Sequence, residues 1–337
     1  MAATFTSQVT YSPTRPEGTV VLVSSGVDST ICGDMYPAAT RLFVDFGQAE
    51  LAREYSAVEA LFPDIEVAHI VARIAHTGDG VFVPARNLLL ACVAVQYGDH
   101  IVMGGMKDDR SIDKTPAAFQ AMSRILSDQS GYPVTVESPL FDLLKHEAVG
   151  QYIAQGTTPN GQQERRDRMR RTWSCYGAED QPCLRCKACF RWAVALRVNA
   201  IPVPMPQQDI VTGYLGRLHI YEPGRQWAIL TALRLWHDDR HAGARPVAMV
   251  DIDGVLTTDT AGQDYVARQP DLAALARLAE LAETHWVVLN TARDESDRTV
   301  TEAWLRTCGG PHHALLMNKA AGNVLVDDRS VRRLADV

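Results

Sequence analysis

Short apolar runs alternate with longer stretches of helical periodicity in the first hundred residues. The β-branched and leucine-rich run 19–23 predicts a strand that stops at Ser24-Ser25-Gly26 and leads into a helix. Because strand and helix alternate in this way, the pattern predicts an α/β fold built on a doubly wound parallel sheet. The other elements expected in this half are strands at 41–46, 65–71 and 100–103 and helices at 51–61 and 87–97.

A second alternation begins at Pro246. It predicts a further, smaller α/β domain of Rossmann-like type, preceded by a connector that contains a helix at 226–236. The chain is therefore expected to have three parts, 1–206, 207–245 and 246–337. The elements expected in the last part are strands at 247–253, 286–291, 314–317 and 323–328 and helices at 272–283 and 295–306.

Composition and charge indicate an ordinary globular protein. The 337 residues are 46% hydrophobic and 22% charged, and this length favours two domains over one. The net charge of −7 argues against broad electrostatic binding to nucleic acid and favours a small-molecule partner. The sequence has neither a secretory signal pattern nor an apolar stretch of about 18 residues, so we expect a cytoplasmic protein without a membrane partner.

Four of the seven cysteines are clustered, and they predict a metal site. Cys175, Cys183, Cys186 and Cys189 lie within fifteen residues, which in a reducing compartment suggests metal rather than disulfides. Four thiolates enclose one tetrahedral zinc and leave no position for a catalytic water, so the zinc would be structural. An iron–sulfur cluster and cysteines that merely pack are the alternatives.

A candidate phosphate loop follows the first strand. The string Ser24-Ser25-Gly26-Val27-Asp28-Ser29 offers backbone amides, hydroxyls and the positive end of a helix to a polyphosphate. No Gly-Lys-Ser/Thr follows, which disfavours transfer of a terminal phosphate as in kinases and GTPases. A capped turn between strand and helix, without a ligand, is the alternative.

This string resembles the pyrophosphate loop of ATP pyrophosphatases, which adenylate a carboxylate or carbonyl oxygen before a nitrogen or sulfur nucleophile displaces AMP. Further segments in the same order make residues 20–191 similar to 7-cyano-7-deazaguanine synthases, the QueC-type enzymes of queuosine biosynthesis. These segments are Asp45-Phe46-Gly47-Gln48, Val83-Pro84-Ala85-Arg86-Asn87, Ser138-Pro139-Leu140 with Lys145 and Glu147, and Ser174-Cys175-Tyr176 followed by the other three clustered cysteines.

The resemblance implies that the enzyme uses ATP and ammonia to convert 7-carboxy-7-deazaguanine first to an amide and then to a nitrile. Two departures bear on this. Ser25 replaces the first of two adjacent glycines, and a Tyr-Pro-Asp-Cys string is absent from residues 105–119. An amide, or an acyl group joined to another amine, therefore stays open as the product. The residues implied are Ser24, Ser25, Gly26, Val27, Asp28, Ser29, Gln48, Arg86 and Asn87 for ATP and its magnesium, Lys145 for catalysis, and the four cysteines for zinc.

Carboxylates are expected at the sheet edge of the last domain. Asp251-Ile252-Asp253-Gly254 ends a hydrophobic strand, and the carboxyl edge of a parallel sheet is where ligands bind in such folds. One carboxylate can attack phosphorus while its neighbour handles the proton of the leaving group. Thr291 and Arg293 could orient phosphoryl oxygens, Lys319 could neutralise charge, and Asp327-Asp328 could hold magnesium.

This ordered set resembles haloacid dehalogenase-type phosphatases, and particularly the phosphatase domain of polynucleotide kinase. The resemblance implies that Asp251 is the nucleophile, that Asp253 is the general acid and base, and that Asp328 binds magnesium together with these two residues. The short interval between Gly254 and Thr291 leaves little room for a cap domain, so the open site would admit a nucleotide or a nucleic-acid end. A degenerate, inactive module is the alternative.

The leading hypothesis is an ATP-dependent carboxylate-activating ligase of 7-deazaguanine metabolism fused to a magnesium-dependent phosphohydrolase. Its expected partners are ATP, ammonia or another amine, a 7-carboxy-7-deazaguanine-like acid, and a phosphorylated nucleotide or nucleic-acid end; a homodimer is compatible with it. Two alternatives stay open. One is a tRNA sulfur-transfer enzyme with the same type of loop, and the other is a non-catalytic, zinc-stabilised nucleotide-binding protein.

Overall fold

The computed structural model describes most of the chain. The described residues are 16–48, 51–70, 75–77, 80–82, 84–107, 109, 111–175, 177, 181–258 and 264–319, so the strand expected at 323–328 lies outside them. The chain divides into two compact units, residues 1–180 and 181–337. Among the helices described, none has the length and apolar character that crossing a membrane requires.

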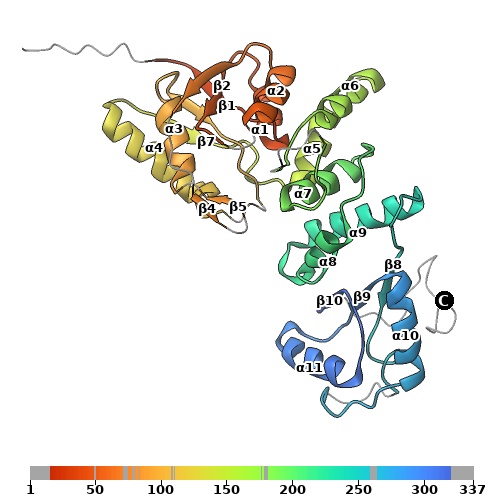
Figure 1. The fold of residues 1–337 in the computed structure, drawn as a ribbon. Coiled ribbons are helices and arrows are strands. Elements are labelled where there is room, and N and C mark those ends of the chain that lie inside the picture. The colour runs from red at the N-terminus through yellow and green to blue at the C-terminus, as the bar shows by residue number, and fades with distance from the viewer. Residues whose placement is uncertain are drawn as a thin grey trace, which may run out of the picture. The chain divides into compact units, whose positions relative to one another are not determined.

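A five-stranded parallel sheet forms the centre of the first unit (Figure 1). The chain runs outward from β1 to β3 and then returns to the other side of β1, so the strand order is β3-β2-β1-β6-β7. The prediction of a parallel-sheet α/β fold is thereby confirmed. The strands are β1 (Thr19–Leu22), β2 (Thr40–Asp45), β3 (Glu66–His69), β6 (His100–Val102) and β7 (Thr135–Glu137).

The central strands are buried on both faces, as their continuous hydrophobic runs predict. Val20 and Leu22 belong to one core cluster with Phe119 of α4 (Pro116–Ser130). Val21 and Phe43 point to the opposite face, because side chains alternate along a strand, and both are 2% exposed or less. Helices therefore cover both faces of the sheet.

The helices of the first unit start where local capping allows it. The side chain of Thr115 accepts a hydrogen bond from the amide of Ala118 at the start of α4, and Pro116 takes the first helical position. Thr158 and Pro159 do the same for α6. The other elements are α1 (Val27–Met35), α2 (Leu51–Leu61), β4 (Ala75–Thr77), β5 (Gly80–Phe82), α3 (Arg86–Ala94), η1 (Ile112–Lys114), α5 (Lys145–Ala154) and α6 (Pro159–Arg170).

A polar cluster joins three of these helices. The guanidinium of Arg168 on α6 donates to both carboxylate oxygens of Asp34 on α1, at 2.6 and 2.7 Å. The hydroxyl of Tyr152 on α5 donates to the same carboxylate at 2.6 Å. Burial and the negative charge of Asp34 raise the pKa of this tyrosine, so it stays a hydrogen-bond donor at neutral pH. The cluster therefore fixes α1, whose N-terminus carries the predicted phosphate loop.

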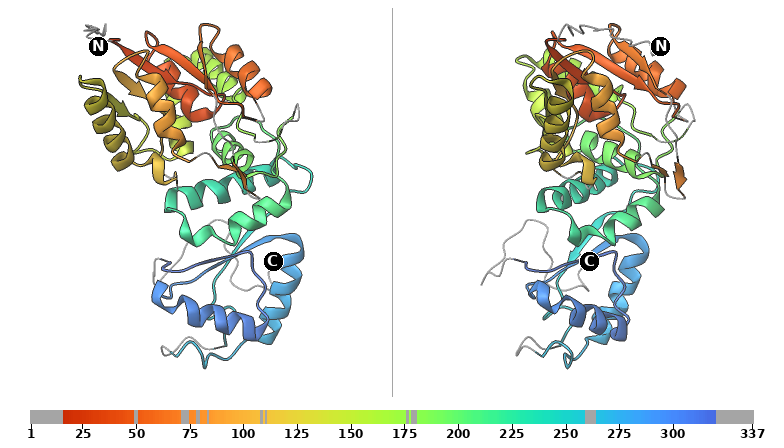
Figure 2. Two further views of the ribbon diagram at one scale, coloured as in Figure 1. Left: turned by 60° about the vertical axis from the view of Figure 1, so that its left-hand side comes forward. Right: turned by 90° about the vertical axis from the view of Figure 1, so that its left-hand side faces the viewer.

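The second unit contains a three-stranded parallel sheet of order β10-β9-β8, with α10 and α11 beside it (Figures 1 and 2). The predicted division at 206 and 245 stays a prediction. The elements are α7 (Lys187–Arg197), α8 (Gln208–Leu215), η2 (Leu218–Ile220), α9 (Pro223–Asp238), β8 (Val247–Val250), α10 (Leu272–Thr284), β9 (Trp286–Asn290), η3 (Glu295–Asp297), α11 (Arg298–Cys308) and β10 (Ala314–Leu316).

Several element boundaries in this unit differ from the predictions, and two of them lie beside predicted site residues. The strand predicted to reach Asp253 ends at Val250, because the carboxylate of Asp251 accepts the amide of Ile252 at 2.8 Å and the chain turns through Gly254 at φ 79°. The helix predicted from residue 295 begins as the 3₁₀ turn η3, and α11 proper starts at Arg298.

We expect Leu278→Ala to lower the free energy of unfolding by about 2 to 4 kcal/mol, because it removes buried methyl groups and leaves a cavity. Leu278 is 0% exposed and packs in the core of the second unit. Leu272→Ala is the matched control on the same helix, since Leu272 is 73% exposed. Urea denaturation measures both; equal losses would contradict the assignment of the buried face of α10.

Candidate functional site

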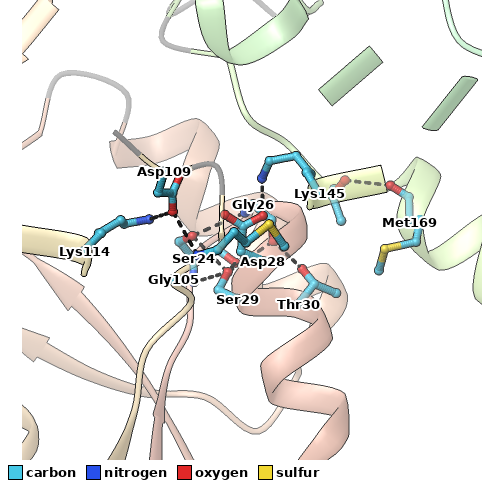
Figure 3. Close-up of polar contacts among 12 residues, drawn as sticks. Ser24, Gly26, Asp28, Ser29, Thr30, Gly105, Asp109, Lys114, Lys145 and Met169 are labelled. Atoms are coloured by element: carbon cyan, nitrogen blue, oxygen red, sulfur yellow. Dashed lines mark hydrogen bonds and ion pairs between the residues drawn. The ribbon is translucent and has the colours of Figure 1, made fainter. Parts of the chain in front are cut away.

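The loop after β1 is held in shape by its own serines (Figure 3). The amide of Ser24 donates to the hydroxyl oxygen of Ser29 at 3.0 Å, and that hydroxyl donates to the carbonyl oxygen of Ser24 at 2.8 Å. Gly26 is the N-cap residue of α1, and no side chain caps this helix. The amides of the first turn, from Val27 onward, therefore face the loop without a side-chain acceptor, which is the arrangement that binds phosphate at helix N-termini.

Ser25, which replaces a glycine of the similar family, is turned toward the segment before the cysteine cluster. Its hydroxyl donates to the carbonyl of Trp173 at 2.8 Å, and its carbonyl accepts the amide of Trp173 at 2.6 Å. The side chain is only 2% exposed. Its hydroxyl therefore ties the loop to the backbone of Trp173.

Lys145 reaches the loop from the start of α5. Its ammonium group forms an ion pair with the carboxylate of Asp28 in the first turn of α1, and both side chains are more than four-fifths buried (Figure 3). Glu147 accepts the amide of Leu144 at 2.8 Å and so fixes the start of α5. The structure thus brings together two residues, predicted for one site, that are 117 positions apart.

The other residues predicted for ATP have structural partners or are exposed. Asn87 is 3% exposed and donates to the carbonyl of Asp113 at 3.3 Å. Gln48 is 6% exposed, donates to Glu54 at 2.9 Å and accepts the amide of Phe46 at 3.1 Å. Arg86 is exposed at the first position of α3. Asn87 therefore holds the backbone at Asp113, and Gln48 holds the backbone at Phe46.

Two charged residues that the motifs did not single out lie at the same sheet edge. Lys114 ends η1, and its ammonium nitrogen lies 3.4 Å from a carboxylate oxygen of Asp109 (Figure 3). The side chains are 24% and 6% exposed. No local pattern predicts this pair; the only signal in the sequence was its position after the strand β6.

The four clustered cysteines converge. Their sulfur atoms all lie within 4.8 Å of one another, and Cys183 and Cys189 are 3.9 Å apart. A tetrahedral zinc with Zn–S bonds of about 2.3 Å requires ligand separations of about 3.8 Å, so the donor set fits zinc. Cys175 and Cys186 also accept backbone amides of Gly177 and Cys189, at 3.2 and 3.3 Å, which suits thiolates.

In the second unit, the residues predicted at the sheet edge form two ion pairs. The guanidinium of Arg293 donates to both oxygens of Asp253, at 2.9 and 2.8 Å, and to the hydroxyl of Thr301 at 3.2 Å. Lys319 lies 2.8 Å from a carboxylate oxygen of Asp251.

Backbone hydrogen bonds help to set the positions of these charged residues. The amide of Lys319 donates to the carbonyl of Thr291 at 2.9 Å, so the segment after β10 lies beside the end of β9. Thr291 itself is 0% exposed. Five of the predicted residues are therefore adjacent, while Asp328 lies outside the described residues.

Arg268 is a further member of this site that sequence reasoning missed. Its Nε lies 3.8 Å from Asp253, its side chain is 4% exposed, and its carbonyl accepts the indole N–H of Trp304 at 2.9 Å. It stands in the interval between the Asp251 and Thr291 motifs, where no pattern marks it. Among the described residues of this site, Arg268, Arg293 and Lys319 are thus three cations beside the carboxylates of Asp251 and Asp253.

Comparison with known proteins assigns part of the chain. Residues 75–200 match the family model described as "Queuosine biosynthesis protein QueC". The 7-cyano-7-deazaguanine synthase of Desulfitobacterium hafniense is 28% identical over 211 residues, which cover 50% of this chain and 84% of that protein. The synthase of Koribacter versatilis is 26% identical over 235 residues (58% and 95%), and that of Desulforudis audaxviator is 26% identical over 222 residues (53% and 96%). Residues 75–200 are thus similar to the QueC family, and 7-cyano-7-deazaguanine synthases align with about half of the chain.

Proposed function

We propose that the first half of the chain is an ATP-dependent C–N ligase of 7-deazaguanine metabolism, of the kind used in queuosine biosynthesis. It would adenylate a 7-carboxy-7-deazaguanine-like acid and join it to ammonia. The observation that carries this proposal is the ion pair between Lys145 and Asp28, which lies at a helix N-terminus that no side chain caps. The match of residues 75–200 to the QueC family supports it.

The positions of the Asp28 and Lys145 charges suit the following two-step reaction. A carboxylate oxygen of the acid attacks the α-phosphorus of ATP, the bond to the pyrophosphate oxygen breaks, and pyrophosphate leaves. Ammonia then attacks the acyl carbon, the bond to AMP breaks, and loss of a proton gives the amide. The amides after Gly26 and the ammonium of Lys145 would stabilise charge that develops on the phosphoryl oxygens.

Magnesium that accompanies ATP would further screen this charge, and Asp28 and Ser29 offer the oxygen ligands that it prefers. Conversion of the amide to the nitrile requires a second activation, this time of the amide oxygen. An amide product, or an acyl group joined to another amine, is the alternative outcome, because residues 105–119 depart from the family.

We propose in addition that the last part of the chain is a magnesium-dependent phosphohydrolase of haloacid dehalogenase type. The observation that favours it is the ion pair of Lys319 with Asp251 beside the Arg293 and Asp253 pair. Asp251 would attack phosphorus of a nucleotide or nucleic-acid phosphate, the bond to the leaving oxygen would break, and Asp253 would protonate that oxygen. Water then hydrolyses the aspartyl phosphate and releases phosphate.

In this second site Lys319 would offset the charge that accumulates around Asp251, and Arg293 orients Asp253 through a bidentate hydrogen bond. The residues proposed for magnesium are Asp251, Asp253 and Asp328, and carboxylates are suitable donors for that ion. For the cysteine cluster we propose a structural zinc, because four thiolates leave no open coordination position.

Asp28→Ala should abolish AMP formation from ATP, ammonia and 7-carboxy-7-deazaguanine, since it removes the partner that positions Lys145. Mass spectrometry of the products distinguishes nitrile, amide and no reaction. Asp128→Ala, at an exposed position of α4, is the control and should keep activity. Sulfide-dependent labelling of tRNA would instead favour the sulfur-transfer alternative, and ATP binding without AMP release would favour the non-catalytic one.

Asp251→Asn should reduce magnesium-dependent phosphate release from nucleotide monophosphates by at least about 100-fold, because an amide is a poor nucleophile toward phosphorus. AMP formation by the other site should be unchanged. Glu283→Gln, exposed on α10, serves as the matched control. Phosphate release that persists in Asp251→Asn would remove this residue from the reaction.

Cys183→Ser should lower the bound zinc from one ion per chain toward zero and destabilise the protein, because metal binding contributes to folding. Elemental analysis and thermal melting with and without a chelator measure the two effects. Cys92, an exposed cysteine outside the cluster, provides the control Cys92→Ser, which should retain the metal. Iron in place of zinc in the purified protein would overturn the assignment of the ion.

A further inference from the structure

The strand order of the first unit reverses at β1, and the loops that follow the strands on the two sides of this reversal are its two walls. The chain proceeds from β1 to one side and later returns to the other, so the order reverses between β1 and β6, which are hydrogen-bonded neighbours with Val21 opposite Val102. In open α/β sheets, ligands bind outside the carboxyl ends of the strands at such a reversal. The loop after β1 is the wall assigned above to the pyrophosphate of ATP. The segment after β6 is the other wall.

That second wall packs directly on α1. A Cβ atom placed on Gly104 would lie 2.9 Å from Cβ of Asp28, so only glycine permits this approach. The next residue, Gly105, is tied to the end of β7: its amide donates to the hydroxyl oxygen of Ser138 at 3.0 Å, and its carbonyl accepts that hydroxyl at 2.7 Å. The segment is therefore fixed beside the phosphate loop.

Lys114 is the cation of this wall, and its surroundings hold it in place. Asp109, only 6% exposed, pairs with its ammonium and also accepts the amide of Met106 at 3.2 Å. Asn87 donates to the carbonyl of Asp113, just before the lysine, and the N-cap Thr115 follows it. The buried carboxylate of Asp109 and the two backbone anchors thus fix the position of Lys114 in this wall.

One buried side chain of α1 is affected by a charge from each wall. Burial raises the pKa of the Cys32 thiol on α1 to about 12; the negative charge of Asp28 also raises it, and the positive charge of Lys114 lowers it. Both charges therefore act on the same side chain of α1. Figure 3 shows Lys114 and Asp109 on one side of Ser24 and Lys145 on the other.

The proposed reaction needs a cation in this position. The attacking carboxylate and the phosphate that it attacks are both anions, and they repel one another more strongly in a partly buried site than in water. Lys145 is on the pyrophosphate side, where its partner Asp28 lies. We infer that Lys114 binds the carboxylate of the acid to be adenylated, with Asp109 as its positioning residue; this inference rests on the proposed ligase function.

Lys114→Met tests this with two measurements. The first measurement is AMP formation from ATP, ammonia and 7-carboxy-7-deazaguanine. KM for the acid should rise by about 10- to 100-fold, because the variant loses one charge-assisted hydrogen bond. KM for ATP should change by less than about 2-fold. In isothermal titration of the same acid into protein loaded with α,β-methylene ATP, Kd should rise by the same factor. Lys114→Arg should restore part of the affinity.

Asp109→Asn should weaken acid binding by a smaller factor, and it should add nothing in the Lys114→Met background, because it acts through that lysine. Lys107→Met, exposed in the same segment, is the control and should leave both constants unchanged. Thermal melting of each variant checks that the protein is folded.

The outcomes separate this inference from the proposed function. If the wild type binds the acid in a Lys114-dependent way but forms no AMP, the ligase function fails and the binding residue stands. If the acid does not bind to the wild type loaded with the ATP analogue, the inference is wrong. A rise in KM for ATP rather than for the acid would assign Lys114 to the nucleotide and would equally overturn the inference.

Discussion

The pairing of β1 with β2 on one side and β6 on the other is the constraint on which the first site depends. It buries Val21 between two parallel neighbours and makes the connections that leave β1 and β6 diverge. Ligands of open α/β sheets bind at the carboxyl ends of the strands where such connections diverge. Gly104 lets the segment after β6 approach Asp28, so the sheet itself sets the separation of the groups at this point.

The same principle operates at a smaller scale in the second unit. Three parallel strands end together, and each delivers one part of the charged cluster: Asp251 after β8, Arg293 after β9 and Lys319 after β10. A guanidinium that is 1% exposed is costly to bury unless its donors are bonded. Arg293 meets this requirement because it donates to both Asp253 and Thr301. The buried ion pair therefore fixes the position of the Asp253 carboxylate more than it adds to net stability.

The sequence predicted what depends on local periodicity and on motifs with fixed spacing. The parallel sheet, the loop after β1 and the convergence of the four cysteines follow from such signals. Asp109, Lys114 and Arg268 could not be found in this way, because no motif of fixed spacing contains them and their ion pairs form only in the folded chain. For Asn87 the resemblance implies a contact with ATP, and this stays a prediction; in the structure its carboxamide donates to the carbonyl of Asp113.

Each lysine at the two sites already has a carboxylate partner, and this affects how an anion would bind. A long, flexible side chain loses up to about 2 kcal/mol of rotamer entropy when it is fixed, and Asp28, Asp109 and Asp251 have fixed their lysines before any ligand arrives. An ammonium group has three N–H donors, and the ion pair with the carboxylate occupies one of them. An incoming anion can therefore share the cation with its carboxylate, and less of its binding free energy is spent on ordering the site.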